Sequence, residues 1–339
     1  MRVAIDKMSA ALQRCPHFSL LSSHLKDKDA YIVGGAVRDA LIGCPITDLD
    51  LIFPEDPTSF AKSFARLVGG HWFWLDQERR QSRVVVNDDD ECPCYDFALF
   101  RAPTLDLDLL DRDFSINAMA LPLTKDLGLA VLIDPCGGLT ALQDSSLRMV
   151  GNDAFANDPL RVLKGLRHAT VLGLEIEKTT LQTMQEEVSG LNRIAPERIR
   201  QEIWKILSNK QAAKGLQFLQ ESGAGEHLFG SMFANALPAM TVLLKTCREL
   251  WHQLARDNSE INNWLTEEVE QGLNGETLLL WSFMLALMDR EFPNILADKW
   301  RLSRKARANI AAAVGLDAGA LKDFSLIART ERAYAWWSA

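Results

Sequence analysis

The chain has 339 residues, of which 47% are hydrophobic and 24% are charged, and its formal net charge is −8. This length and composition predict a globular protein of two or three domains, and no apolar run approaches the roughly 20 residues that a membrane span needs. Early charges in residues 1–6 argue against a signal peptide, and six scattered cysteines lack the spacing of a zinc site, so we expect a cytoplasmic protein.

The first part of the chain predicts a mixed α/β unit. Short apolar or alternating runs indicate strands, and apolar residues at helical spacing indicate a helix. In chain order we expect strands at 30–33 and 48–53, a helix at 57–68, strands at 83–86 and 95–100, and a turn at 87–90 between the last two strands.

Helical periodicity dominates after about residue 153. Helices are expected at 158–172, 178–191, 196–208, 211–221, 235–256, 276–290 and 302–314. The predicted fold is therefore an α+β head, with a mixed sheet and helices, followed by an all-α neck and body. We place the head at 1–142, the neck at 143–207, and the body with the start of a tail at 208–339.

Gly34 and Gly35 follow the first expected strand and open a helix. Glycines let the backbone approach a bulky anion, and the N-terminus of a helix offers free N–H groups. Arg38 lies about one turn into this helix, within reach of the same anion. The segment predicts a phosphate site, and an ordinary tight turn is the alternative.

Asp48 and Asp50 occupy alternate positions of the second expected strand. Both carboxylates therefore face one side while Leu49 faces the core. Neighbouring carboxylates repel each other, and an oxygen-seeking cation such as Mg²⁺ relieves that repulsion. A phosphate-binding turn followed by paired carboxylates suits nucleoside triphosphate transfer, with Asp96 as a candidate third carboxylate. A pair of solvent-facing strand residues is the alternative.

Five segments carry such residues in a fixed order: GGAVRDALIG leading to DLD (34–50), RDFSINAMA (112–120), DPCGGL with LR (134–148), NDPLR (157–161), and PERI with Glu202 (196–202). Together they resemble the five motifs of the class II tRNA nucleotidyltransferase and bacterial poly(A) polymerase family. The resemblance covers residues 30–207, and beyond about 210 only a helical body is similar.

The resemblance implies an enzyme that extends the 3′ end of RNA with Mg²⁺ as its cofactor. Asp48 and Asp50 would be the catalytic, metal-binding residues. The nucleotide would be bound by Gly34, Gly35, Arg38, Arg112, Asp113, Asn117, Asp158, Arg161 and Lys164.

Asp158 and Arg161 would select the base as an amino-acid template. A carboxylate accepts from the amine that cytosine and adenine share, and a guanidinium donates to the neighbouring acceptor. Asp158 followed by Pro159 also fits a simple helix N-cap. Two positions depart from the family pattern: Asn157 replaces a glutamate, and Lys164 replaces an arginine and cannot form its bidentate fork.

The connection at residues 102–111 is short. Complete CCA-adding relatives carry a long flexible loop there, and its loss resembles CC-adding enzymes, which leave the final A to a separate A-adding enzyme. We therefore expect addition of CC to the tRNA 3′ end from CTP. A complete CCA-adding enzyme, an A-adding enzyme or a poly(A) polymerase, which would use ATP, are the alternatives.

The helical part is expected to bind tRNA through backbone and shape. The candidate contacts are Arg193, Arg198, Arg200, Lys299, Arg301, Arg304 and Lys305. The net charge of −8 argues mildly against a nucleic-acid partner, but binding depends on local basic patches, and a solvated helix face is the alternative for each.

An enzyme of another class, a small-molecule nucleotidyltransferase, is a further alternative, and it would share only the glycine turn and the paired carboxylates. The final Trp336 and Trp337 fit either burial or a longer tail.

Overall fold

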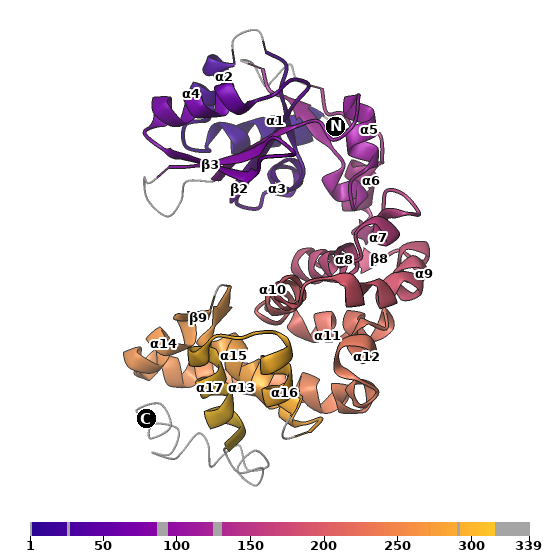
Figure 1. The fold of residues 1–339 in the computed structure, drawn as a ribbon, viewed down its shortest axis with the longest axis vertical. Helices are drawn as coiled ribbons and strands as arrows, with labels where there is room; N and C mark the ends of the chain where they lie inside the picture. The colour runs from indigo at the N-terminus through magenta and orange to yellow at the C-terminus, as the bar shows by residue number, and fades with distance from the viewer. Residues whose placement is uncertain are drawn as a thin grey trace. The chain divides into compact units, whose positions relative to one another are not determined.

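The computed structural model describes residues 2–25, 28–86, 94–124, 131–270, 272–289 and 292–315. The chain divides into two compact units, Met1–Ala154 and Phe155–Ala339. Figure 1 shows a sheet with helices in the first unit and mainly helices in the second, so the predicted fold class is confirmed. The expected boundary at 207–208 stays a prediction. The turn expected at 87–90 and the terminal tryptophans lie outside the described residues.

A six-stranded sheet in the order β3-β4-β5-β2-β1-β6 forms the centre of the first unit. Its strands are β1 (Tyr31–Val33), β2 (Asp48–Phe53), β3 (His71–Asp76), β4 (Gln81–Val85), β5 (Cys94–Leu99) and β6 (Ala120–Pro122). β2 and β5 run parallel, and the other neighbours are antiparallel. The sheet is therefore mixed, as predicted.

One face of this sheet carries the main core of the first unit. Leu49, Tyr95 and Phe97 are fully buried on it, and Phe64 packs edge-on against Tyr95. The helices that contribute to this core are α1 (Arg2–Gln13), α2 (Phe18–His24), α3 (Gly35–Ile42) and α4 (Thr58–Val68). Because side chains alternate along a strand, burial of Leu49 turns Asp48 and Asp50 to the opposite face.

The opposite face is covered in part by α5 (Leu105–Leu110), which forms from the short connection. Leu109 of this helix packs with Val33 and Ile52 in a second, smaller core. Thr104 caps the helix by accepting from the Leu107 N–H at 3.4 Å. The rest of the unit comprises η1 (Ser115–Asn117), α6 (Gly138–Gln143) and β7 (Ser146–Leu147).

The second unit is built mainly from helices. It contains α7 (Ala154–Asn157), which starts at the boundary, α8 (Leu160–Leu172), β8 (Glu175–Ile176), α9 (Lys178–Glu187), η3 (Val188–Arg193), α10 (Pro196–Leu207), α11 (Ala212–Glu221), α12 (Ala224–Phe229), α13 (Met232–Asp257), α14 (Ser259–Thr266), β9 (Glu268–Glu270), β10 (Leu273–Asn274), α15 (Gly275–Ala286), α16 (Phe292–Lys299) and α17 (Arg304–Gly315). Each helix predicted in this region is present with ends shifted by a few residues. The helices α12, α14 and α16 and the β9–β10 hairpin were not predicted.

Candidate active site

Asp50 lies at the centre of the polar face of the sheet. Its Cα pairs with Val33 of β1 on one side and with Asp96 of β5 on the other. Asp48 lies two residues earlier on the same face, and its side chain is 49% exposed. The paired carboxylates predicted from the sequence therefore face one side of the sheet, and Asp96 lies on the adjacent strand.

The glycine turn comes directly against Asp50. Gly34 follows β1 and is the N-cap of α3, with φ of 71° and ψ of −137°, a positive-φ backbone conformation that favours glycine. A Cβ at this position would lie 3.2 Å from Asp50 Oδ2 and 3.4 Å from a terminal nitrogen of Arg112. Residues of the first two motifs therefore meet at one point: the turn, the paired carboxylates and the start of the RDF segment.

Arg38 joins the first and second motifs by hydrogen bonds. Its guanidinium donates to Asn117 Oδ1 at 2.6 Å and to both oxygens of Asp39 at 2.8 and 2.9 Å. Asn117 in turn donates to Asp113 Oδ1 at 3.1 Å. Arg38 is buried and already holds these groups, so its direct contact with a triphosphate stays a prediction.

Arg112 is held by a buried carboxylate that the sequence reasoning missed. Asp108 of α5 is fully buried, and its Oδ1 accepts from Arg112 Nε at 3.3 Å and from a terminal nitrogen at 3.0 Å. The other oxygen, Oδ2, accepts from the Arg101 backbone N–H at 2.7 Å. The helix that forms from the short connection therefore fixes Arg112 beside Gly34 and Asp50.

Arg83 of β4 is the second residue that the sequence reasoning missed. Its guanidinium donates to both oxygens of Asp96, at 2.7 and 2.9 Å, and lies 3.7 Å from Asp48 Oδ1. These hydrogen bonds raise the pKa of Arg83 above its ordinary value. Asp96, the candidate third carboxylate, is thus paired with a cation from the next strand, and its role at the metal site stays a prediction.

The electrostatics of Asp50 follow from this packing. Burial, and then the neighbouring charge of Asp96, raise the pKa of its carboxyl from the ordinary 3.8 to about 6, against the opposing effect of Arg112. A divalent cation would favour the ionised form. Asp48 and Asp50 fit such an ion because Mg²⁺ commonly uses one or two carboxylates together with substrate phosphates and water. In the described residues, no three His, Cys, Asp or Glu side chains form a complete ligand group.

The predicted base-selecting residues lie at the start of α8 in the second unit. Asp158 accepts from the Leu160 N–H at 3.2 Å, as a helix cap does. Lys164 lies 3.4 Å and Arg198 3.9 Å from its other oxygen. Arg161 and Lys164 are half-buried and share one face of the helix, as the spacing predicts. A hydrogen bond from the first N–H of α8 to Asp158 is thus observed, and the template role stays a prediction.

Comparisons with known proteins agree with this arrangement. Residues 30–148 match the model of the "Poly A polymerase head domain", and residues 173–237 match that of the "Probable RNA and SrmB- binding site of polymerase A". A CC-adding tRNA nucleotidyltransferase of Geobacter sulfurreducens is 33% identical over 250 residues, which cover 72% of this chain and 56% of that protein. The chain belongs to the tRNA nucleotidyltransferase and poly(A) polymerase family.

Two further relatives show the breadth of this family. An A-adding tRNA nucleotidyltransferase of Deinococcus radiodurans is 38% identical over 199 residues, covering 57% of this chain and 43% of that protein. The structure of a Thermotoga maritima CCA-adding enzyme complexed with tRNA has a TM-score of 0.74 and 25% identity, and the match covers 97% of this chain and 78% of that chain. This chain spans about half the length of the CC- and A-adding relatives.

One predicted RNA contact of this family member is wrong. Arg200 is buried, and its guanidinium bonds to the carbonyls of Trp300 and Arg301 at 2.7 and 3.0 Å and to Glu270 at 2.7 Å. The side chain therefore joins α10 to the β9–β10 hairpin and the α16–α17 turn, and it is not available to RNA.

The remaining predicted RNA contacts are exposed. Arg301 pairs with Glu197 at 3.3 Å and Lys305 with Glu267 at 2.7 Å, so acidic neighbours offset part of this basic stretch. The other exposed residues of the set are Arg193, Arg198, Lys299 and Arg304. Their contact with tRNA stays a prediction.

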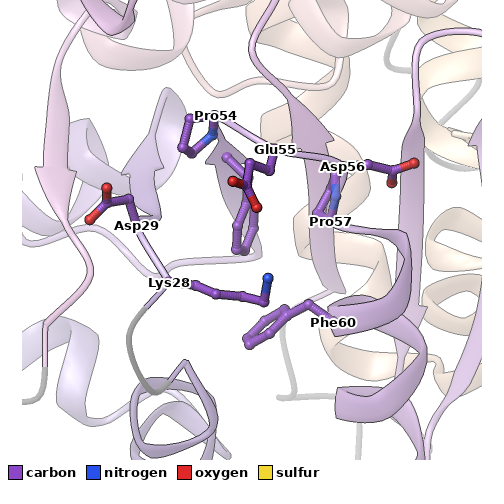
Figure 2. Close-up of a pocket in the computed structure, with 8 residues that line it drawn as sticks. Lys28, Asp29, Pro54, Glu55, Asp56, Pro57 and Phe60 are labelled. Carbon is purple, nitrogen blue, oxygen red and sulfur yellow. The ribbon is translucent and has the colours of Figure 1, made fainter.

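A pocket of about 420 Å³ lies at the far end of β2 from Asp48. Figure 2 shows Lys28 extending toward Glu55 and Phe60 across it. None of its lining residues belongs to the family's motifs, so the pocket is separate from the site described above.

Among the described residues, no helix is long and apolar enough to cross a membrane.

Proposed function

We propose that this chain adds two cytidines to the 3′ end of tRNA from CTP, in the cytoplasm, and leaves the terminal adenosine to a separate A-adding enzyme. The observation that carries the proposal is the meeting of the Gly34 turn, Asp50 and Arg112 at one point of the sheet. A glycine turn and a cationic group lying against a carboxylate of the pair support nucleotidyl transfer, which needs phosphate-binding groups beside metal-binding carboxylates.

In the proposed reaction the 3′-hydroxyl oxygen of the RNA forms a bond to the α-phosphorus of CTP. The bond from that phosphorus to pyrophosphate breaks, pyrophosphate leaves, and the hydroxyl proton passes to solvent. Asp48 and Asp50 would hold Mg²⁺, which would supply positive charge against the phosphate oxygens and the attacking hydroxyl. The backbone at Gly34 and the guanidinium of Arg112 bind phosphate oxygens.

Selection of the incoming base is assigned to the second unit. Asp158 and Arg161 hydrogen-bond the edge of cytosine, and Asp113 and Asn117 position the ribose. Lys164 and Arg198 lie 3.4 and 3.9 Å from one oxygen of Asp158 and orient its carboxylate. The exposed basic residues of this unit bind phosphates of the tRNA without reading its sequence, since every tRNA must be accepted.

The limitation to CC rests on α5. Where complete CCA-adding relatives have a long flexible loop, this chain has a capped helix whose Asp108 fixes Arg112. A fixed connection favours one nucleotide over a switch between two. The 38% identity to an A-adding enzyme supports A addition as the second candidate.

An extension assay tests the proposal. Purified protein with Mg²⁺ receives tRNA that ends before CCA, or tRNA that ends in CC, with CTP, ATP or both, and the products are resolved on a sequencing gel. Two added C residues on the first substrate and no addition to the second support the proposal. Addition of CCA, of a single A, or of a long A ladder would each overturn the CC assignment, and failure on every RNA would favour a small-molecule substrate.

A further inference from the structure

A row of charged residues crosses three neighbouring strands on the polar face of the sheet. Arg83 of β4 pairs in register with Asp96 of β5, which pairs in register with Asp50 of β2. The side chains of Arg83 and Asp96 are 30% and 9% exposed. The register therefore places one permanent cation at the end of a row of carboxylates.

The Arg83 guanidinium bonds to both oxygens of Asp96. Its Nε donates to Oδ1 at 2.7 Å and a terminal nitrogen donates to Oδ2 at 2.9 Å, which is the bidentate fork that arginine forms with a carboxylate. The same group lies 3.7 Å from Asp48 Oδ1. One cation thus neutralises one carboxylate fully and approaches a second.

We propose that Arg83 is a positioning residue that withholds Asp96 from the metal, so that the divalent ions are held weakly by Asp48 and Asp50 until a nucleoside triphosphate supplies further oxygens. This inference rests on the proposed function, because it takes the paired carboxylates as the metal site. Without the bidentate pair to Arg83, Asp96 would be a third carboxylate ligand beside Asp48 and Asp50. A divalent cation would then bind in the absence of nucleotide.

Removing this cation is expected to raise, and not to lower, the affinity of the protein for metal alone. Removing the positive charge of Arg83 tightens the binding of metal alone, because repulsion is lost and Asp96 becomes available as a ligand. Arg83→Met keeps the length of the side chain without its charge. Arg83→Lys keeps the charge and loses the fork. Asp96→Asn removes the withheld carboxylate in either background.

The experiment titrates Mn²⁺ alone into the full chain, without nucleotide or RNA, and measures free Mn²⁺ by electron paramagnetic resonance. Arg83→Met is expected to tighten Mn²⁺ binding by about fivefold or more, and Arg83→Lys by less than about twofold. Asp96→Asn alone is expected to change the affinity by less than about threefold, and in the Arg83→Met background to remove the gain.

Unchanged or weaker Mn²⁺ binding by a folded Arg83→Met protein would overturn the proposal. Equal weakening by Asp96→Asn in both backgrounds would do the same, because it would make Asp96 an ordinary ligand. Thermal unfolding checks that each variant is folded, and Arg83→Gln replaces Arg83→Met if that variant does not fold. Abolition of Mn²⁺ binding by Asp50→Asn would locate the metal site, so that failure of the Arg83 role is distinguishable from failure of the proposed function.

Discussion

Asp50 is predicted to destabilise the metal-free protein at neutral pH. Its folded-state pKa of about 6 lies above the ordinary 3.8, so folding must take an ionised carboxylate into a buried, negatively charged place. A rise of this size corresponds to about 3 kcal/mol, which is an upper value because water and ions partly relieve it. Asp50→Asn removes the charge and keeps the shape, and it should therefore raise the free energy of unfolding by up to about 3 kcal/mol near pH 7.5.

The destabilisation by Asp50 depends on pH in a direction that is set by its raised pKa. Because the folded-state pKa is raised, the destabilisation is absent below about pH 4, grows between the two pKa values and is complete above about pH 6. The gain from Asp50→Asn should fall to roughly half near pH 5. Urea unfolding in EDTA, followed by circular dichroism at both pH values, measures this.

Asp48→Asn is the matched control for this experiment. The Asp48 side chain is half-exposed, and the substitution is expected to change stability by less than about 0.5 kcal/mol. A gain from Asp50→Asn that is absent, or that is equal at both pH values, would refute the reasoning from burial and neighbouring charge.

Three further predictions follow from the described contacts. Asp108→Asn loses the charged partner of Arg112 and should raise KM for the nucleotide about tenfold, with tRNA binding unchanged in a filter assay; an unaltered KM would contradict this positioning. Gly34→Ala places a Cβ against Asp50 at a left-handed φ and should lower kcat/KM at least about tenfold while circular dichroism stays native. Arg200→Ala removes the cation beside Glu270 and the donor to two carbonyls, and should cost about 3–5 kcal/mol in urea unfolding, whereas Arg198→Ala at the exposed neighbouring position should cost less than about 0.5; similar losses for both would contradict the buried role.

The parts of the site that the sequence predicted are those set by local geometry. The alternation of Asp48 and Asp50 on a strand follows from the period of two, and the turn at Gly34 follows from the conformations open to glycine. These features need no knowledge of distant residues. Four strands of the sheet, its polar face and the position of the turn were therefore predictable from short segments, whereas β3 and β6 were not predicted.

The parts that were missed depend on pairing across the fold. Arg83 meets Asp96 only because β4 and β5 pair in one register, which the residues of either strand do not reveal. Asp108 lies in an alternating Leu-Asp pattern that is not helical in period, and only the cap at Thr104 signals the helix that buries it. The signal was present at Thr104, three residues before the N–H that it caps.

Arg200 shows the same limit for surface predictions. A run of basic residues indicated a binding face, but the partners that bury Arg200 lie 70 to 101 residues further along the chain. Arg198, two positions earlier, is exposed. The position of the neighbouring elements, and not the local charge, decides which of the two can meet RNA. Strand β3 was missed for a different reason. Its aromatic residues follow one another and do not alternate with polar ones.

The central claim is that the paired carboxylates of the first unit perform nucleotidyl transfer at the tRNA 3′ end. The most direct measurement compares the parent chain with Asp50→Ala for incorporation of radiolabelled CTP and, in parallel, for tRNA binding by filter retention. Asp50→Ala is expected to abolish incorporation while tRNA binding is nearly unchanged. Normal incorporation by Asp50→Ala would contradict the assignment of nucleotidyl transfer to these carboxylates.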